Sequence, residues 1–174
     1  MWSQSACDHI KYRWYTKKSL KLVERLVILG ILDVANYSEW RSPPFAQPKP
    51  KSNWVRFLSD FRNLNKQLKW KPYPIPKINE MLLKIEGFQY ATSIYLNMGY
   101  YHIRLRKNSS NLCTVIIPWG KYQYKRLPTG VANYIDIFQQ KMNDLFHRFE
   151  LICAYIYDIL ILIKGDWADN IQNL

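Results

Sequence analysis

Cysteine is scarce in this chain of 174 residues, which holds only Cys7, Cys113 and Cys153. Three thiols so far apart in the sequence form neither a disulfide framework nor a zinc knuckle, because a zinc knuckle needs ligands in close pairs. Few cysteines without a disulfide pattern are typical of a reducing compartment. We therefore expect an intracellular protein, cytoplasmic or nuclear, that is not secreted.

Long hydrophobic runs are also missing. The longest, residues 151–163, is interrupted by Asp158 and is shorter than the roughly 20 apolar residues of a membrane-spanning helix. The N-terminal sequence MWSQSACDHIKYRW lacks the apolar stretch of a signal peptide. We expect no membrane association, and a hydrophobic content of 48% is enough for one packed core.

Acidic residues are few, since 13 Asp and Glu accompany 25 Lys and Arg and leave a formal charge of +12. Residues 41–77 contain one acid, Asp60, and the bases Arg41, Lys49, Lys51, Arg56, Arg62, Lys66, Lys69, Lys71 and Lys77. Such a segment suits a polyanion, because every neutralised phosphate releases condensed counterions. A basic surface that only keeps the protein solvated would have the same composition.

Aromatic side chains are interleaved with these charges: Trp54, Phe57, Phe61, Trp70 and Tyr73. Aromatic rings between cations offer stacking surfaces to bases as well as charge to phosphates. Packing of the same rings in the core is an equally good explanation of some of them.

Three segments show helical spacing of apolar residues. Residues 17–29 are expected to form an amphipathic helix that ends at Gly30, and a second helix is expected from Ile78 to Gly87. A long helix with one apolar stripe is predicted by Ile135, Phe138, Met142, Leu145 and Phe149.

The remaining apolar segments read as strands. An extended arm over residues 42–53 is followed by a strand at 54–59, and period-two patterns predict strands at 88–96 and 100–105. Hairpins are predicted for residues 112–117 with 121–127 and for 151–156 with 159–163. Strands and helices without regular alternation indicate an α+β fold, an antiparallel sheet packed against helices on one face.

Asp158 is the most informative acid, because it stands between the two apolar runs of the last hairpin. A carboxylate in that position is costly unless it caps a tight turn or meets a cation. A simple turn aspartate would satisfy the first condition.

The order of these segments, from about Leu20 to the C-terminus, resembles the fingers and palm of the reverse transcriptases of gypsy-type long-terminal-repeat retrotransposons. KLVERLVILGIL with SEWRSPPFAQPKP is similar to the family's first helix and S-x-W-x-S-P segment, and RFLSDFRNLNK with YPIPKI is similar to its basic fingers strand. LPTGVAN with DIFQQKMNDLF looks like the loop and helix beside template and nucleotide. The resemblance implies an N-terminal extension (1–19), a fingers-like region (20–90) and an incomplete palm (91–174).

By the same resemblance, a set of residues would contact the incoming nucleotide. Arg56 would hold the triphosphate with help from Lys49 or Lys51, Arg62 would support that region, and Tyr100 would exclude the ribose 2′-hydroxyl. The remaining candidate contacts are Thr129, Gly130 and Gln139. Loop cations that close over a triphosphate fit the charge pattern.

The family's metal site is incomplete in this sequence. Two Mg²⁺ ions are held in the family by an L-D-L-x-x-G-Y aspartate and the two acids of Y-x-D-D, but SIYLNMGYYHI places Tyr95 at the first position and YIYD places Tyr157 at the second. Asp158 and the backbone carbonyl of Leu96 remain. A phenol with a pKa near 10 does not replace a carboxylate, so Mg²⁺ binding is expected to be defective. We expect Tyr95 and Tyr157 to lie together beside Asp158.

The sequence therefore predicts a degenerate, truncated reverse-transcriptase fragment of a retrotransposon Pol polyprotein, ancestrally an RNA-directed DNA polymerase and now catalytically impaired or inactive. Tyr134 and Ile135, which precede the long helix, and the end of the sequence at Leu174 are further departures from the family. Its expected partners are an RNA or DNA template-primer and a deoxynucleoside triphosphate. A non-catalytic nucleic-acid-binding module and a protein-interaction subunit are the alternatives.

Overall fold

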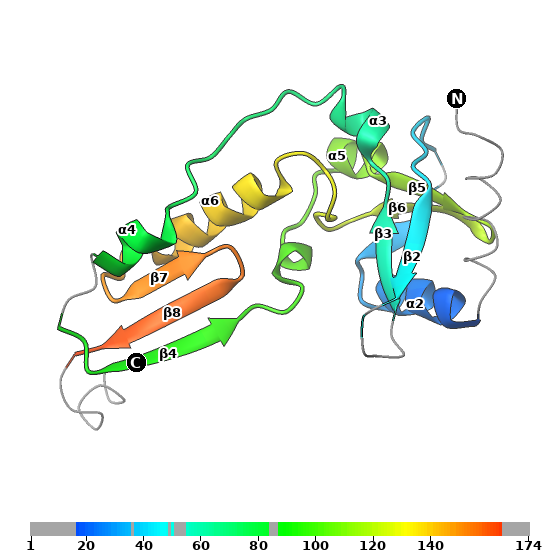
Figure 1. Ribbon diagram of the computed structural model, residues 1–174. Helices are drawn as coiled ribbons and strands as arrows, with labels where there is room; N and C mark the ends of the chain where they lie inside the picture. The colour runs from blue at the N-terminus through cyan, green and yellow to red at the C-terminus, as the bar shows by residue number, and fades with distance from the viewer. Residues whose placement is uncertain (1–16, 36, 49, 51–54, 84–86, 165–174) are drawn as a thin grey trace. The chain divides into compact units, whose positions relative to one another are not determined.

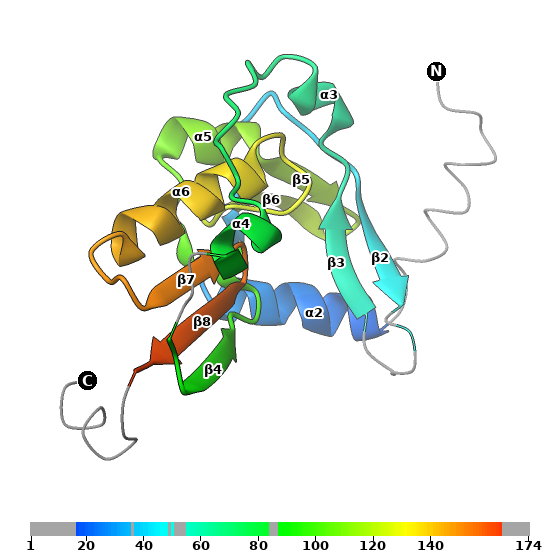
Figure 2. The same ribbon diagram turned by 60° about the vertical axis from the view of Figure 1, so that its left-hand side comes forward.

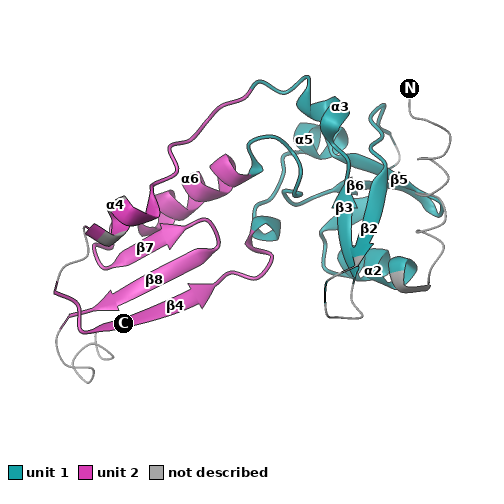
Figure 3. Ribbon diagram, viewed as in Figure 1, with its two compact units in different colours: residues 1–69, 100–134 teal, residues 70–99, 135–174 magenta. Residues whose placement is uncertain are grey.

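The computed structural model describes residues 17–35, 37–48, 50, 55–83 and 87–164 (Figure 1). The chain forms two compact units, each made of two separate stretches: residues 1–69 with 100–134, and residues 70–99 with 135–174 (Figure 3). The fingers-like and palm-like ranges expected above, 20–90 and 91–174, remain a prediction. The division into two compact units does not identify either unit as fingers or palm.

Helix α2 (Lys17–Ile28) begins the first unit and confirms the helix expected there. Val23 and Leu26 are buried, and the helix ends where Gly30 takes a positive φ of 65°. The N–H of Gly30 donates to Val27 and that of Ile31 donates to Leu26, which is the Schellman pattern that a glycine permits. The chain then turns directly into the first sheet.

The first unit contains two small antiparallel sheets. Strands β1 (Leu32–Val34), β6 (Gly120–Tyr124) and β5 (Thr114–Ile117) form one in that order, and β2 (Pro44–Pro48) with β3 (Val55–Ser59) forms the other. The short helices α3 (Arg62–Asn65) and α5 (Lys107–Leu112) complete the unit.

In the core of this unit, some of the aromatic side chains of the basic segment are packed. Phe57 and Phe61 are buried and lie edge-on to the fully buried Tyr124, with ring centroids 6.3 and 6.0 Å apart. The Tyr124 hydroxyl is satisfied by the hydroxyl of Ser59 at 2.9 Å. These two rings serve packing, whereas Trp70 is 72% exposed and Trp54 lies outside the described residues.

The second unit is one three-stranded antiparallel sheet with helices. Its strand order is β4 (Tyr90–Tyr95), β8 (Asp158–Ile163), β7 (Ile152–Tyr155). Helix α6 (Tyr134–Phe146) runs beside the β7–β8 hairpin in both views (Figures 1 and 2), and α4 (Ile78–Leu83) belongs to the same unit. In the described part of the chain no helix is long and apolar enough to cross a membrane.

Most predicted elements are present and the α+β class is confirmed, but the strand expected at 100–105 is wrong. Its first residues form the 3₁₀ helix η1 (Gly99–His102). Tyr101 is buried and the adjacent Tyr100 packs against the same core, which is impossible for neighbours in a strand because they point to opposite faces. Three short elements, β1, α3 and α5, were not predicted.

The predicted apolar stripe of the long helix is confirmed only in part. Phe138 and Met142 are buried, but Leu145 is 64% exposed and Phe149 lies beyond the end of α6. The buried face includes instead a polar side chain, Gln139, at 0% exposure. A hydrophobicity pattern does not register a buried amide.

Candidate functional site

The tip of the β7–β8 hairpin brings together the residues that the sequence places at the metal site. Tyr95 of β4 is directly opposite Asp158 of β8 in the antiparallel register, and Asp158 also pairs with Tyr155 of β7. The rings of Tyr95 and Tyr157 meet edge to face with centroids 6.5 Å apart. The expectation that the two tyrosines lie beside Asp158 is confirmed.

The turn itself is held from two sides. The N–H of Leu96 donates to the carbonyl of Tyr157 at 2.8 Å, which ties the end of β4 to the turn. Ile156 adopts a positive φ of 52°, unusual for a β-branched residue, and its N–H donates to Oε1 of Gln139 at 2.7 Å. The ring of Phe138 lies 5.0 Å from that of Tyr157. Helix α6 therefore supports the turn that presents Asp158.

Gln139 acts in this structure as the anchor of the hairpin. Its Nε2 donates to the carbonyl of Ala154 at 2.9 Å and to Oδ1 of Asn143 at 2.8 Å, while Oε1 accepts from Ile156. The nucleotide contact that the resemblance assigns to Gln139 remains a prediction. These three hydrogen bonds of the Gln139 amide all join it to other groups of the protein.

The residues at the hairpin tip do not fit a two-ion centre. Asp158 is exposed, each tyrosine offers a single phenol oxygen where a carboxylate offers two, and the carbonyl of Leu96 accepts a hydrogen bond from the N–H of Gly99 at 3.2 Å. Among the described residues no group of three or more His, Cys, Asp and Glu side chains is close enough to hold a metal ion. Magnesium prefers several carboxylate oxygens, and this tip offers one carboxylate.

The basic residues expected at the triphosphate lie in the first unit. Arg56 is exposed on β3, opposite Gln47 of β2. Arg62 makes a two-pronged ion pair with Asp60, Nε to Oδ1 at 2.9 Å and Nη2 to Oδ2 at 2.6 Å, and this hydrogen-bonded guanidinium holds the pKa of Asp60 below its usual range. Lys49 and Lys51 lie outside the described residues.

The loop that carries Thr129 and Gly130 is joined to the same part of the unit by one side chain. Asn65, at the end of α3, donates from Nδ2 to the carbonyl of Gly130 at 2.8 Å and accepts at Oδ1 from the N–H of Ala132 at 2.7 Å. Gly130 has a φ of 91°, and a Cβ there would lie 3.3 Å from the carbonyl of Ser59. Asn65 was not singled out from the sequence, where nothing marks it among neighbouring polar residues.

Tyr100 belongs to the first unit. Its ring lies 4.4 Å from that of Tyr101, whose burial raises the pKa of the Tyr101 phenol well above its usual value. The structure therefore collects Tyr95, Leu96, Tyr157, Asp158 and Gln139 in one unit and Arg56, Arg62, Tyr100, Thr129 and Gly130 in the other. Their roles in nucleotide binding remain predictions.

Comparison with known proteins identifies the family of the chain. Residues 47–173 match the family described as reverse transcriptase (RNA-dependent DNA polymerase), and the chain belongs to that family. The sequence is 31% identical to the retrovirus-related Pol polyprotein from transposon opus of Drosophila melanogaster over 87% of this chain and 16% of that protein. It is 28% identical to the corresponding polyprotein from transposon gypsy of the same organism, over 68% of this chain and 12% of that protein.

Solved structures show the same fold. The foamy viral protease-reverse transcriptase in complex with double-stranded DNA superposes with a TM-score of 0.79 at 21% identity, covering 89% of this chain and 27% of that chain. The chain thus spans less than a third of the solved structure and less than a fifth of the two transposon polyproteins. The likeness to gypsy-type elements is confirmed, together with the reverse-transcriptase-like α+β fold.

Proposed function

We propose that this chain is the reverse-transcriptase part of a retrotransposon polyprotein whose polymerase centre is catalytically impaired. The observation that carries the proposal is the pair Tyr95 and Tyr157 beside Asp158, in register and in ring contact. These are the positions at which the resemblance places two of three metal-binding aspartates. The fold is retained while the donor set is reduced to one carboxylate.

The chemistry of the family explains why this loss matters. Phosphoryl transfer with two divalent ions depends on carboxylates that fix both ions close together. A tyrosine phenol offers one neutral oxygen on a bulky ring, and Tyr95 is 64% exposed at this tip. Asp158 alone supplies too few oxygens and too little negative charge for a pair of Mg²⁺ ions.

The proposed partners are nucleic acid, as an RNA or DNA template-primer, and a deoxynucleoside triphosphate. The charge of +12 and the basic segment 41–77 support a polyanionic partner. So does the fold, which is shared with a foamy viral enzyme whose structure was solved with double-stranded DNA. Of Arg56, Lys49 and Lys51, the candidates for the triphosphate, Arg56 is the one that lies within the described residues, and it is exposed on β3.

Metal binding tests the impairment without requiring turnover. Mn²⁺, titrated by electron paramagnetic resonance, should bind the unaltered chain weakly, whereas Tyr95→Asp with Tyr157→Asp should tighten binding by about tenfold or more because carboxylates are the preferred ligands. Adding Asp158→Asn to that double variant is the control and should reverse the gain. Equal affinity of the unaltered chain and the double variant would refute the proposal.

Primer extension tests the activity directly. With Mg²⁺ or Mn²⁺, the chain should not extend a primed RNA or DNA template above an Asp158→Ala control. Either single change to aspartate should also leave the chain inactive, because residues that serve one centre act as a unit. Extension by the unaltered chain that Asp158→Ala abolishes would contradict the impairment.

A second candidate function is that of a nucleic-acid-binding module without catalysis. The exposed Arg56 and Trp70, a cation and an aromatic ring in the basic segment, favour it specifically. Binding of primed template without extension in the preceding assay is the result expected of such a module. A protein-interaction subunit would bind no nucleic acid at low salt.

A further inference from the structure

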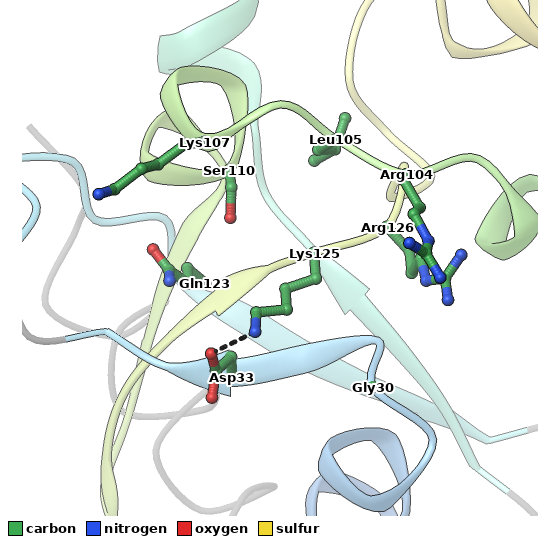
Figure 4. A pocket seen from close by; sticks show the side chains of 9 residues that line it. All are labelled: Gly30, Asp33, Arg104, Leu105, Lys107, Ser110, Gln123, Lys125 and Arg126. Carbon is green, nitrogen blue, oxygen red and sulfur yellow. Dashed lines mark ion pairs between the residues drawn. The ribbon is translucent and has the colours of Figure 1, made fainter.

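A basic pocket lies within the first unit, and none of its lining residues is among those that the resemblance assigns to the nucleotide or the metal ions. It has a volume of about 580 Å³ and is lined by segments from β1, β6, α5 and the stretch before α5 (Figure 4). Its charged lining residues are Asp33, Arg104, Lys107, Lys125 and Arg126. Four cations and one acid therefore share one concave surface.

The backbone forces two of these cations together. The N–H of Leu105 donates to the carbonyl of Lys125, and the N–H of Leu127 donates to that of Ile103, both at 2.9 Å. These flanking bonds make Arg104 and Arg126 the directly opposed residues of an antiparallel bridge, in its non-hydrogen-bonded position. Side chains at such a position approach most closely, with Cα atoms about 4.5 Å apart.

The two guanidinium groups consequently lie at the same end of the pocket (Figure 4). Nη1 of Arg126 donates to the carbonyl of His102 at 3.2 Å, which keeps that side chain in place. Like charges directly opposite each other in a sheet are destabilising. Two opposed arginines in this position therefore repel each other, and in the described part of the chain no ion pair offsets that repulsion.

The one acid that lines the pocket, Asp33, already has an ion-pair partner. Asp33 pairs with Lys125 at 2.8 Å, and this hydrogen bond from the Lys125 ammonium lowers the pKa of the Asp33 carboxyl. Among the described residues no carboxylate lies within ion-pair distance of Arg104, Lys107 or Arg126. An anion between the two arginines would relieve their repulsion, and guanidinium forks match phosphate oxygens in pairs.

We propose that this pocket binds phosphate groups, held between Arg104 and Arg126 with Lys107 at the rim. The site takes either a short polyphosphate or consecutive phosphates of a nucleic-acid strand, which present the same chemistry. It does not depend on the polymerase centre, so it stands or falls separately from the metal-binding experiment.

Titration calorimetry with inorganic tripolyphosphate and with a short single-stranded oligonucleotide tests the site. Arg104→Glu with Arg126→Glu should weaken binding of at least one probe by about tenfold or more, because two phosphate contacts are lost. The control, Lys21→Glu with Arg25→Glu, makes the same charge change on the exposed face of α2 and should alter binding less than about twofold. Equal losses in both variants would show a general charge effect and overturn the site.

The two probes distinguish the sources of phosphate. Tighter binding of tripolyphosphate assigns the pocket to a small anion, and tighter binding of the oligonucleotide assigns it to a strand. Binding of neither probe at low salt overturns the proposal.

A milder variant covers the case in which the double reversal does not fold. Arg104→Gln removes one of the opposed charges, so it should raise the melting temperature of the free protein and abolish the increase that tripolyphosphate produces in the unaltered chain. Lys107→Gln is the companion variant at the rim and should reduce that increase only in part. An unchanged tripolyphosphate response in Arg104→Gln would contradict the assignment.

Discussion

Gln139 is the residue on which the geometry of the hairpin tip depends most directly. It is fully buried, and its amide satisfies the N–H of Ile156 and the carbonyl of Ala154. Those backbone groups belong to a turn whose Ile156 is held at a positive φ. A strained turn persists only where its surroundings over-determine it, and a single side chain supplies much of that constraint here.

Gln139→Leu should therefore destabilise the chain by about 2–4 kcal/mol, because the buried carbonyl of Ala154 and the partly buried N–H of Ile156 lose their partner. Chemical denaturation followed by tryptophan fluorescence measures the change in the free energy of unfolding. Gln140→Leu is the matched control, since Gln140 is exposed on the same helix, and it should change stability by less than about 0.5 kcal/mol. Similar losses in the two variants would show that the amide does not anchor the turn.

The buried thiol of Cys113 should make the stability of the protein depend on pH. Burial raises the pKa of its thiol from 9.0 to about 12. Above pH 9 the thiol ionises in the unfolded chain but stays protonated in the folded one, so the unfolded state gains stability as protons are withdrawn. The contribution is fully present below pH 9 and is lost as the pH rises toward 12.

The free energy of unfolding should accordingly fall between pH 8 and 10, approaching a slope of about 1.4 kcal/mol per pH unit for this one group. Cys113→Ala should flatten that slope whatever it does to the stability at pH 7. Cys153→Ala is the control. The Cys153 thiol is only partly buried, and although burial raises its pKa too, the effect on the slope should be smaller than that of Cys113. Parallel pH profiles for Cys113→Ala and the unaltered chain would contradict the argument.

At the scale of elements, strand β4 is the feature most open to unwanted pairing. All six of its residues, Tyr90–Tyr95, are exposed, and within the described residues it pairs only with β8. It contains no charge, proline or glycine. Natural edge strands usually carry such residues because a bare edge is a template for another strand.

Thr92→Lys, in the middle of β4, should reduce self-association without loss of fold, because a lysine at a sheet edge opposes pairing with a second copy. Analytical ultracentrifugation across a concentration series measures the effect. Asn63→Lys adds the same charge at an exposed position of α3 and serves as the control. If both lysines reduced association equally, net charge and not the edge would be responsible.

At the scale of the whole molecule, the charge of +12 is the dominant property. The chain has 25 Lys and Arg against 13 Asp and Glu, so pairing with its own acids one to one would still leave 12 bases unmatched. A large excess of positive charge raises the local concentration of polyanions and accelerates their association. The molecule should therefore bind nucleic acid even without polymerase activity.

We expect sequence-indifferent binding with a dissociation constant on the order of 10⁻⁴ to 10⁻⁶ M that weakens steeply with salt. Fluorescence anisotropy with labelled single-stranded and duplex probes at several salt concentrations measures it. Reversal of Lys49, Lys51 and Arg56 to glutamate should weaken the binding, with the reversal of the exposed Lys21, Arg25 and Arg148 to glutamate as the charge-matched control. Binding that is insensitive to salt would show that phosphate contacts do not drive it.

Several features of this protein were determined by the sequence itself, because they depend on local chemistry. Helix α2 and its glycine stop, the β5–β6 and β7–β8 hairpins and the family resemblance follow from periodicity, turn residues and ordered motifs. The same motifs indicated that Tyr95 and Tyr157 would meet beside Asp158.

Tertiary structure decided the features that arise between segments distant in the chain. Tyr100 and Tyr101 became a 3₁₀ helix because both pack against one core, Gln139 became a buried anchor because the hairpin folded over α6, and Arg104 came to oppose Arg126. Periodicity describes how neighbours along the chain share a face. It carries no information on which distant segments pack together or which backbone groups they leave to be satisfied, and those contacts placed these side chains.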